Sequence, residues 1–430
     1  MDAARCHWDM TSVSLHGAFE HPEDGFPQVK YGHPKDRRPD LKQIQAGLAV
    51  TADGGIPILH RAFSGGASEV AQVVDTMHAL QQIAARPGVL LVGDSKLISY
   101  TNAAAMCQAG TFFIAPAAAS KVPHHVYAAL DPAAAHLVDY IPVRDRNKPA
   151  DQRGTYRVLE DTHTLTGRRK SDPEVSLRRI LVHSSANATA QAAARELKLT
   201  RAREDLNRLQ RGLGGPHYKT TEKVTARIVV ITKQRRVGTY LRTAVGADPD
   251  TGKPTLDWSF DEEAIAADRA VDGWYALLTN LPAGQAGAEQ VFLHYKGQSE
   301  IERRYSEVKG PLAVAPMFLH HNRRIAALIT VICLALLVYC LMERQVRLAL
   351  GGRQTMCGLY GYGPNRAARP TGRLILETLS DLRLRAGTAT DPPAVLVNRG
   401  AQAELLELLD IDPTRPRWLE SPFHTCEIRG

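Results

Sequence analysis

Four polar residues near position 300 have side chains that could act on a phosphodiester. They are Tyr295, Gln298, Glu302 and Lys309. Their offsets of 0, 3, 7 and 14 place them within roughly 60° of one another on an α-helix that turns about 100° per residue. A carboxylate on such a stripe could ligate a metal ion, and an ammonium two turns away could bind a phosphate. The alternative is a solvated helix with scattered charges, which these four residues alone favour.

A second candidate acid ends a strand that is predicted at the centre of a sheet. Residues 89–92 form an uninterrupted apolar run and are followed by Gly93 and Asp94. Such a run is typical of the buried centre of a mixed α/β sheet, and open α/β sheets place their chemistry at the carboxyl ends of these strands. The alternative is that Asp94 or Ser95 caps a helix predicted over 97–110. Taken alone, Asp94 favours the capping role.

A third acid, Asp9, lies inside a β-prone run over residues 7–15. Asp9, Asp94 and Glu302 thus put one carboxylate on a first strand, one after a central strand and one on a helix. A two-metal phosphoryl-transfer site requires such a set, because anionic oxygens must hold two Mg²⁺ ions about 3.5–4 Å apart. Since this transfer depends on positioning and charge neutralisation, it calls for no nucleophilic serine or cysteine.

The elements that must position these acids alternate strands with helices. Strands are expected over 44–50 and 56–63, and the Asp53-Gly54 pair between them is a strong hairpin signal. Helical apolar spacing covers 70–85. These elements predict an α/β fold in which helices flank a mixed sheet.

The amino-acid composition changes in the central part of the chain, which is first Ala/Pro-rich and then basic. A long basic amphipathic helix is expected over 185–211, ending at Gly212. It could lie along a phosphate backbone, although a solvated helix face is the commoner outcome. Strands are expected over 224–232, 237–243 and 274–278.

These patterns predict an α+β insertion that interrupts a catalytic core. Two helices are expected near the end of the chain, over 371–385 and 401–409. The expected divisions are 1–115 as the first part of the core, 116–290 as the insertion, 291–350 as the second part of the core, and 351–430 as a C-terminal linker and tail.

Composition allows a polyanionic partner without requiring one. The 430 residues include 53 Lys and Arg against 45 Asp and Glu, for a formal charge of +8. The six cysteines form no C-x-x-C pair, which fits a reducing cytoplasm better than a disulfide framework. The first residues have no apolar core of a secretory signal.

One apolar segment has two interpretations. Residues 325–342 contain Thr330 as the only plainly polar residue. By length the segment is a marginal transmembrane candidate, which would make the chain a single-span membrane protein. The favoured interpretation is a helix buried on nearly all sides within a large domain.

Several blocks, in order, resemble the DDE transposases of bacterial insertion sequences, in the subgroup with a Tyr-Arg-Glu-Lys signature. That signature spaces its residues as in the stripe above, with Gln298 here in the arginine position. The blocks that resemble the family are WDMTSVSLHG at 8–17, KDRRPDLKQ at 35–43, GDSKLIS at 93–99, DGWYALLTN at 272–280 and PTGRLILETL at 370–379.

The resemblance implies an RNase H-like core interrupted by the insertion before the last catalytic helix. It also implies metal-dependent cleavage and strand transfer of insertion-sequence ends, with water and then a DNA 3′-hydroxyl as nucleophile. Asp9, Asp94 and Glu302 would ligate two Mg²⁺ ions, for which Mn²⁺ would substitute. The expected DNA-binding residues are Tyr295, Gln298, Lys309, Lys35 and Arg38.

The same resemblance sets the expected partners and the competing hypothesis. We expect double-stranded DNA as transposon end and target, a homodimer assembled on DNA, no membrane, and a bacterial cytoplasmic location. Gln298 keeps a hydrogen bond but loses the charge that an arginine would supply. Family members usually carry a substantial region before the first Asp, so we expect this chain to be truncated, the product of a split reading frame, or a decayed copy. The competing hypothesis is therefore a non-catalytic DNA-binding remnant or regulator.

Overall fold

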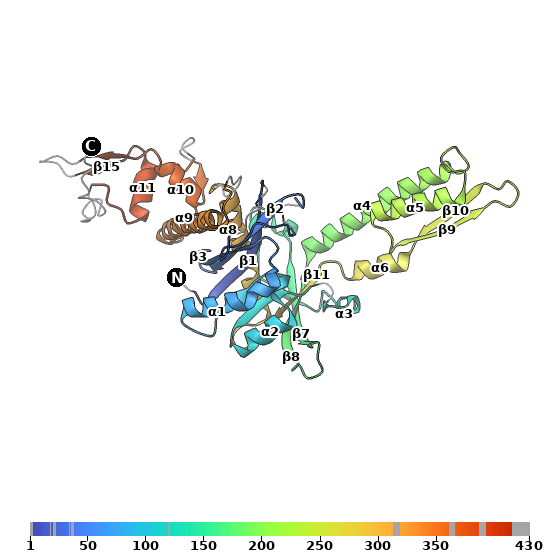
Figure 1. The fold of residues 1–430 in the computed structure, drawn as a ribbon, viewed down its shortest axis with the longest axis horizontal. Coiled ribbons are helices and arrows are strands. Elements are labelled where there is room, and N and C mark those ends of the chain that lie inside the picture. Colours follow the sequence, from blue (N-terminus) through green and yellow to red (C-terminus); the bar gives the residue numbers. More distant parts are fainter. Residues whose placement is uncertain are drawn as a thin grey trace. The chain divides into compact units, whose positions relative to one another are not determined.

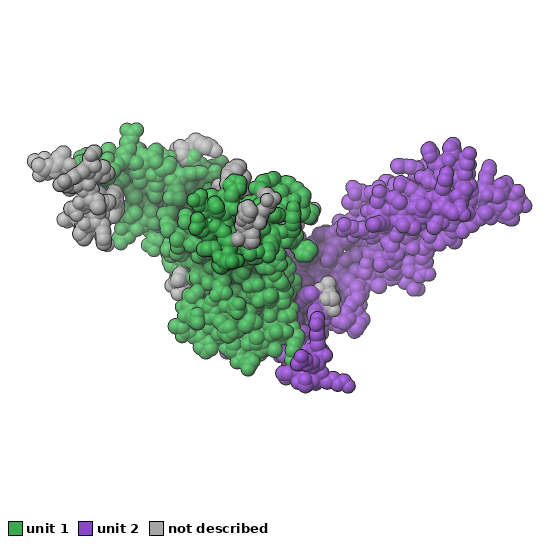
Figure 2. All heavy atoms as spheres, viewed as in Figure 1, with its two compact units in different colours: residues 1–112, 296–430 green, residues 113–295 purple. Residues whose placement is uncertain are grey.

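The computed structural model describes residues 3–17, 19, 23–33, 35, 38–118, 121–312, 319–360, 366–386 and 393–414. The chain forms two compact units, coloured separately in Figure 2. Unit 1 comprises residues 1–112 and 296–430, and unit 2 comprises residues 113–295. These divisions fall close to the ends of the predicted insertion. The independence of that insertion as a domain stays a prediction.

Unit 1 is built on four strands in the order β3-β2-β1-β4. Figure 1 labels β1, β2 and β3. β1 pairs antiparallel with β2 and parallel with β4, and β2 pairs antiparallel with β3. The strands are β1 Arg5–Leu15, β2 Lys42–Thr51, β3 Pro57–Ser64 and β4 Leu90–Val92. The predicted class, an α/β fold with a mixed sheet flanked by helices, is confirmed.

The Asp-Gly signal between β2 and β3 marks a tight turn, as predicted. The main-chain nitrogen of Gly55 donates to the oxygen of Thr51 at 3.1 Å. Gly54 and Gly55 have φ values of 86° and 61°, a region that glycine enters without the steric penalty of a Cβ atom.

The helices of unit 1 come from both ends of the sequence. They are η1 Glu69–Gln72, α1 Val73–Ala84, η2 Ser95–Leu97, α2 Tyr100–Gln108, α8 Ser299–Lys309, α9 Asn322–Ala349, α10 Gly372–Leu379 and α11 Gly400–Leu408. The helix predicted over 97–110 begins only at Tyr100, because the hydroxyl of Ser99 accepts from the nitrogen of Asn102 as its N-cap.

The core of unit 1 lies between the sheet and the pair α8 and α9. Side chains of a strand alternate between the two faces of a sheet, and Val13 and Leu15 of β1 lie in one buried cluster with Ile301 and Tyr305 of α8. Isoleucines of α9 complete that cluster, with Ile325 fully buried. The odd-numbered residues of β1 therefore face α8, which matters for Asp9.

The predicted single helix across Tyr295–Lys309 is wrong. α7, Ala288–Lys296, stops before a two-residue turn, and α8 starts anew at Ser299. Gly297 supplies the break, since glycine weakens a helix interior by about 1 kcal/mol relative to alanine. The four polar residues consequently do not form one stripe on one helix.

The expectation that residues 325–342 are buried on nearly all sides is also wrong. α9 is long and apolar enough to cross a membrane by length and composition alone, and 33% of its most apolar window is buried. One side packs on the sheet, whereas Val331, Leu334 and Val338 are more than half exposed.

Beyond α9, the segment predicted as linker and tail contains packed structure. Val346 of α9 and Leu350, which follows the helix, share a buried cluster with Met356, Leu359 and Ile375. The helix predicted over 371–385 is too long, because α10 ends at Leu379. The helix predicted over 401–409 is confirmed as α11, and residues 415–430 lie outside the described part of the chain. The short strands are β12 Met356–Cys357, β13 Ala367–Ala368, β14 Arg383–Arg385 and β15 Ala394–Leu396.

Unit 2 combines antiparallel strands with a helical hairpin. Its strands β5, β11, β8, β7 and β6 pair in that order, and β9 pairs with β10. The strands are β5 Phe112–Pro116, which begins at the unit boundary, β6 His136–Val138, β7 Tyr156–Leu165, β8 Val175–Ser184, β9 Leu241–Ala247, β10 Pro254–Phe260 and β11 Trp274–Thr279. Its helices are α3 His124–Ala128, α4 Ser185–Arg211, α5 Thr221–Arg235 and α6 Glu262–Ala270.

The long helix of unit 2 has the predicted bounds, but two predicted strands do not. Residues 224–232 lie in α5, where Val224, Ile228 and Ile231 bury one helical face against α4. This packing overrides the β preference of a run rich in Val, Ile and Thr. The strand predicted over 237–243 begins only at Leu241.

Candidate active site

Asp9 and Asp94 come together because of the register of two parallel strands. His7 of β1 pairs with Val92 of β4. Asp9 lies two residues further along β1, and Asp94 lies two residues past Val92, where β4 ends, so the two acids stand at about the same level. The strand pairing thus places two carboxylates side by side at the carboxyl end of β4, as expected for an open α/β sheet.

A third acid, Glu69, joins this pair from the first turn of η1. Ligand oxygens of Asp9, Glu69 and Asp94 all lie within 4.8 Å of one another. Asp9 and Glu69 are mostly shielded, with side chains 18% and 15% exposed. We call Asp9, Glu69 and Asp94 the acid cluster.

Two lysines form ion pairs with the acid cluster. Lys35 Nζ lies 3.0 Å from Asp9 Oδ1 and 3.9 Å from Glu69 Oε1, and Lys96 Nζ lies 2.7 Å from Glu69 Oε2. Burial raises the pKa of Asp9 above its ordinary value, with a smaller contribution from the charge of Asp94, and the ammonium of Lys35 opposes this rise only in part. The site therefore disfavours the ionised form of Asp9 while no further cation is present.

Asp94 fills both of the roles that its sequence context allowed. Its Oδ1 accepts from the main-chain nitrogen of Lys96 at 2.9 Å and so caps η2. The same carboxylate also belongs to the acid cluster. Capping uses one lone pair of a group that has about four, so the cap fixes the direction of the carboxylate and leaves acceptor sites for a ligand.

Glu302 lies outside the acid cluster. It occupies an exposed position in the first turn of α8, and it is not among the described acids whose oxygens fall within 4.8 Å of one another. One helical turn later, Tyr305 Oη donates to the main-chain oxygen of Asp9 at 2.6 Å. α8 is thus fixed to β1 beside Asp9, although the structure does not bring the Glu302 carboxylate into the cluster.

The predicted DNA-binding residues have different surroundings. Gln298 Oε1 lies 3.2 Å from His7 Nδ1, within hydrogen-bonding distance, and Lys309 ends α8 at an exposed position. Arg38 pairs with Asp40 at 2.7 Å at the surface of unit 1. Tyr295 belongs to unit 2. Of the five, Lys35 contacts two cluster acids, Asp9 and Glu69.

The acid cluster has the donor set that a hard divalent cation prefers. Mg²⁺ and Mn²⁺ bind carboxylate oxygens in preference to softer ligands. Three carboxylates from β1, η1 and the turn after β4 converge here, and the charge of Asp94 adds to the burial that raises the pKa of Asp9. The residues present therefore fit such an ion, provided that the two lysines release the acids.

Sequence reasoning missed Glu69 and the role of Lys96. Glu69 begins a helical segment, where an acidic residue usually only complements the helix dipole. Lys96 lies within the block 93–99 that resembles the second-acid block, but no spacing rule links it to Glu69. The available signal was local: both residues follow shortly after predicted sheet strands, as active-site residues on loops often do.

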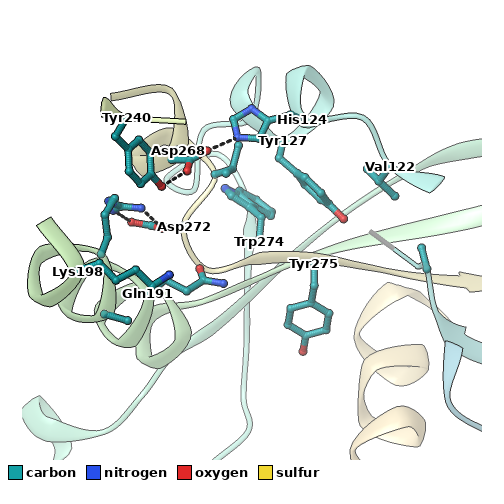
Figure 3. A pocket seen from close by; sticks show the side chains of 14 residues that line it. Val122, His124, Tyr127, Gln191, Lys198, Tyr240, Asp268, Asp272, Trp274 and Tyr275 are labelled. Carbon is teal, nitrogen blue, oxygen red and sulfur yellow. Dashed lines mark hydrogen bonds and ion pairs between the residues drawn. The ribbon is translucent and has the colours of Figure 1, made fainter. Parts of the chain in front are cut away.

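Unit 2 contains a separate cavity of about 520 Å³ beside α4 and β11 (Figure 3). Arg195 and Asp272 form an ion pair on its wall, and Tyr240 donates to Asp268, which also contacts His124 Nε2 at 3.2 Å. These charged and polar groups satisfy one another. The cavity lies within residues 117–275, and none of its lining residues belongs to the acid cluster.

Comparison with known proteins identifies the family. The sequence matches the family model described as a transposase DDE domain over residues 8–338. None of the curated proteins matches the chain. Among solved structures, the chain is similar to that of a piggyBac transposase synaptic complex with hairpin DNA, at 9% identity and a TM-score of 0.33, covering 78% of this chain and 46% of that chain. The present chain thus aligns with less than half the length of that structure's chain. Because the matched family model covers most of the sequence, the protein belongs to the transposase DDE domain family.

Proposed function

We propose that this chain catalyses divalent-metal-dependent cleavage and strand transfer of DNA at the ends of a bacterial insertion sequence. The observation that carries the proposal is the convergence of the Asp9, Asp94 and Glu69 carboxylates within 4.8 Å of one another, just past the parallel pairing of His7 in β1 with Val92 in β4. Family membership supports a role in DNA transposition, and the acid cluster supports a metal-dependent reaction.

In this proposal the acid cluster holds one divalent ion, and Glu302 contributes to a second when DNA is bound. When bound, two Mg²⁺ ions supply positive charge that activates a water or 3′-hydroxyl nucleophile and stabilises the leaving oxygen. Lys35 and Lys96 exchange their carboxylate partners for DNA phosphates. This exchange frees Asp9 and Glu69 for the metal and keeps the lysine charges paired.

The partner in this proposal is double-stranded DNA, both as transposon end and as target, in the bacterial cytoplasm. Gln298, Lys309, Arg38 and Tyr295 are proposed to contact its backbone. Such contacts are charge-dependent, so binding should weaken steeply with salt.

Strand transfer from a pre-nicked end duplex tests the proposal. The duplex carries the DNA that flanks the gene, and the reaction contains Mn²⁺ or Mg²⁺. We expect a joined product from the wild type and a loss of about 1000-fold in Asp94→Asn, equivalent to about 4 kcal/mol of transition-state stabilisation. Asp75→Asn, an exposed acid of α1 outside the cluster, serves as the matched control. No product from the wild type, or equal product from Asp94→Asn, contradicts the proposal.

The second candidate function is a non-catalytic DNA-binding remnant or regulator. The exposed position of Glu302 outside the acid cluster and the ion pairs of Lys35 and Lys96 favour it. It predicts salt-dependent DNA binding without any metal-dependent product. The strand-transfer assay, run beside a binding assay, separates the two functions.

A further inference from the structure

The solvent side of α9 carries a continuous stripe of apolar side chains. Its five large aliphatic residues are between 45% and 60% exposed. The whole stripe, which we call the α9 stripe, consists of Ala327, Val331, Leu334, Val338, Leu341, Gln345 and Leu348.

The α9 stripe lies opposite the side of the helix that packs in unit 1. At 100° per residue, the stripe residues cluster within about 100° of one another, and the buried positions Ile329, Ile332 and Leu336 fall on the other side. A surface helix normally turns charged residues to water. This stripe has none, and its sole polar member is Gln345. An apolar surface of this kind marks an interaction site.

The spacing within the stripe is that of a coiled coil. Successive members are separated by four and three residues in strict alternation across three heptads. Val331, Val338 and Gln345 take one core position of the heptad, and the leucines take the other with Ala327. Valine at the first position with leucine at the second favours two-stranded pairing, and a single polar residue at the first position fixes register.

We propose that the α9 stripe pairs with the α9 stripe of a second copy of this chain, without DNA. In a two-fold symmetric interface the same surface of both copies meets, so that surface must be self-complementary. The α9 stripe meets this requirement, because its side chains can pack against the same side chains of the second copy. The inference goes beyond the proposed function, because it assigns a dimer surface that needs neither a metal ion nor a transposon end.

The size and charge of the stripe set the properties of this dimer. The stripe is about 32 Å long at 1.5 Å per residue and roughly 10 Å wide, which is smaller than the roughly 800 Å² per partner of a standard interface. The dimer should therefore dissociate on dilution. None of the seven stripe residues is charged, so pairing should persist at high salt, where a dimer held together by bound DNA would fall apart.

Sedimentation velocity of the full chain in 0.5 M NaCl, after nuclease treatment, tests the proposal. We expect a monomer–dimer equilibrium for the wild type and a monomer for Val338→Lys, with at least tenfold weaker association. Val229→Lys is the matched control, because Val229 is 60% exposed on α5, away from the stripe, against 56% for Val338. This control should associate as the wild type does.

A second measurement checks direct contact between the two stripes. Val338→Cys should form an intermolecular disulfide under mild oxidation, whereas Val229→Cys should not. A wild type that stays monomeric at the highest concentration, or a Val338→Lys variant that still dimerises, overturns the proposal. So does binding of the wild type to phosphatidylcholine vesicles that Val338→Lys abolishes, since the stripe would then bind lipid.

Discussion

The hydroxyl of Tyr305 donates to the main-chain oxygen of Asp9 at 2.6 Å and approaches that of Ala46 at 3.1 Å. This contact joins α8 to β1 at the residue whose carboxylate belongs to the acid cluster. Burial raises the pKa of Tyr305 well above its ordinary value, so the hydroxyl stays protonated and remains a donor. Tyr305 is therefore a positioning residue that fixes α8 against β1 at Asp9.

Replacing Tyr305 by Phe removes this hydrogen bond while keeping the ring. We expect a loss of about 1 kcal/mol in the free energy of unfolding, because buried carbonyl oxygens lose their donor. We also expect strand transfer to fall by about tenfold as α8 loosens. Tyr339→Phe is the control, since its hydroxyl is buried without a hydrogen-bond partner among the described residues. Urea denaturation and the strand-transfer assay measure both effects, and equal behaviour of the two variants would count against a positioning role.

Glu69 and Glu302 should differ in metal binding without DNA. Glu69→Gln removes a cluster carboxylate, so we expect Mn²⁺ affinity to fall by about 10–100-fold, the range for lost support at metal sites. Glu302→Gln should leave this affinity unchanged, because Glu302 lies outside the acid cluster. Isothermal titration with Mn²⁺ measures the affinity directly. Weaker binding in Glu302→Gln would show that α8 already contributes a ligand in the absence of DNA.

Strand transfer distinguishes the same two variants in another way. Glu302→Gln should abolish product despite normal metal binding, if Glu302 joins the site only on DNA. Full activity of this variant would remove Glu302 from the proposed mechanism and leave Glu69 as the third acid.

The placement of Asp9 and Asp94 could be predicted because it depends on strands. A continuous apolar run and a β-prone run are local patterns, and parallel pairing carries whatever follows each strand to one edge. Glu69 could not be predicted in the same way. It reaches the cluster through the loop after β3, and loop geometry is not encoded in any period of the sequence.

The failed predictions share a different cause. The run in α5 has the β-branched composition of a strand, yet Val224, Ile228 and Ile231 also have helical spacing, and packing against α4 decides between them. The four polar residues between Tyr295 and Lys309 also have helical spacing, but the turn at Gly297 interrupts the helix. Spacing shows which residues could share a face, whereas only packing and the breaks between elements determine whether they do.

The raised pKa of Asp9 predicts how stability depends on pH without metal. Burial favours the protonated form in the folded state, so wild-type stability is fully present at low pH and declines as pH rises through the folded pKa of Asp9. Asp9→Asn lacks this penalty. We expect it to exceed the wild type in stability at pH 7 and to match it near pH 4.

Urea denaturation with a chelator present, at several pH values, measures this difference. Asp40→Asn is a control of opposite sign, because hydrogen bonding to Arg38 lowers the pKa of Asp40. That variant should be less stable than the wild type at pH 7 and converge with it as pH falls through the folded pKa of Asp40. A stability advantage of Asp9→Asn that is independent of pH would rule out the titration of Asp9 as its cause.

Arg304 should be the residue of α8 whose loss costs most stability. Its side chain is fully buried and donates to the oxygens of Gly55 and Gly54 at 2.9 and 2.6 Å. It also pairs with Glu307 at 2.8 Å and with the buried carboxylate of Glu343 at 3.2 Å. The guanidinium thus joins α8 to α9 and to the turn between β2 and β3.

Arg304→Met leaves two carbonyls and part of a buried carboxylate without their donor, so we expect a loss of about 3–5 kcal/mol in the free energy of unfolding. Arg373→Met, which removes an exposed pair with Glu377 on α10, should cost no more than about 0.5 kcal/mol. Urea denaturation of both variants measures the contrast. A small effect at Arg304 would mean that Arg303 and Arg347, which also contact Glu343, suffice to hold α8 in place.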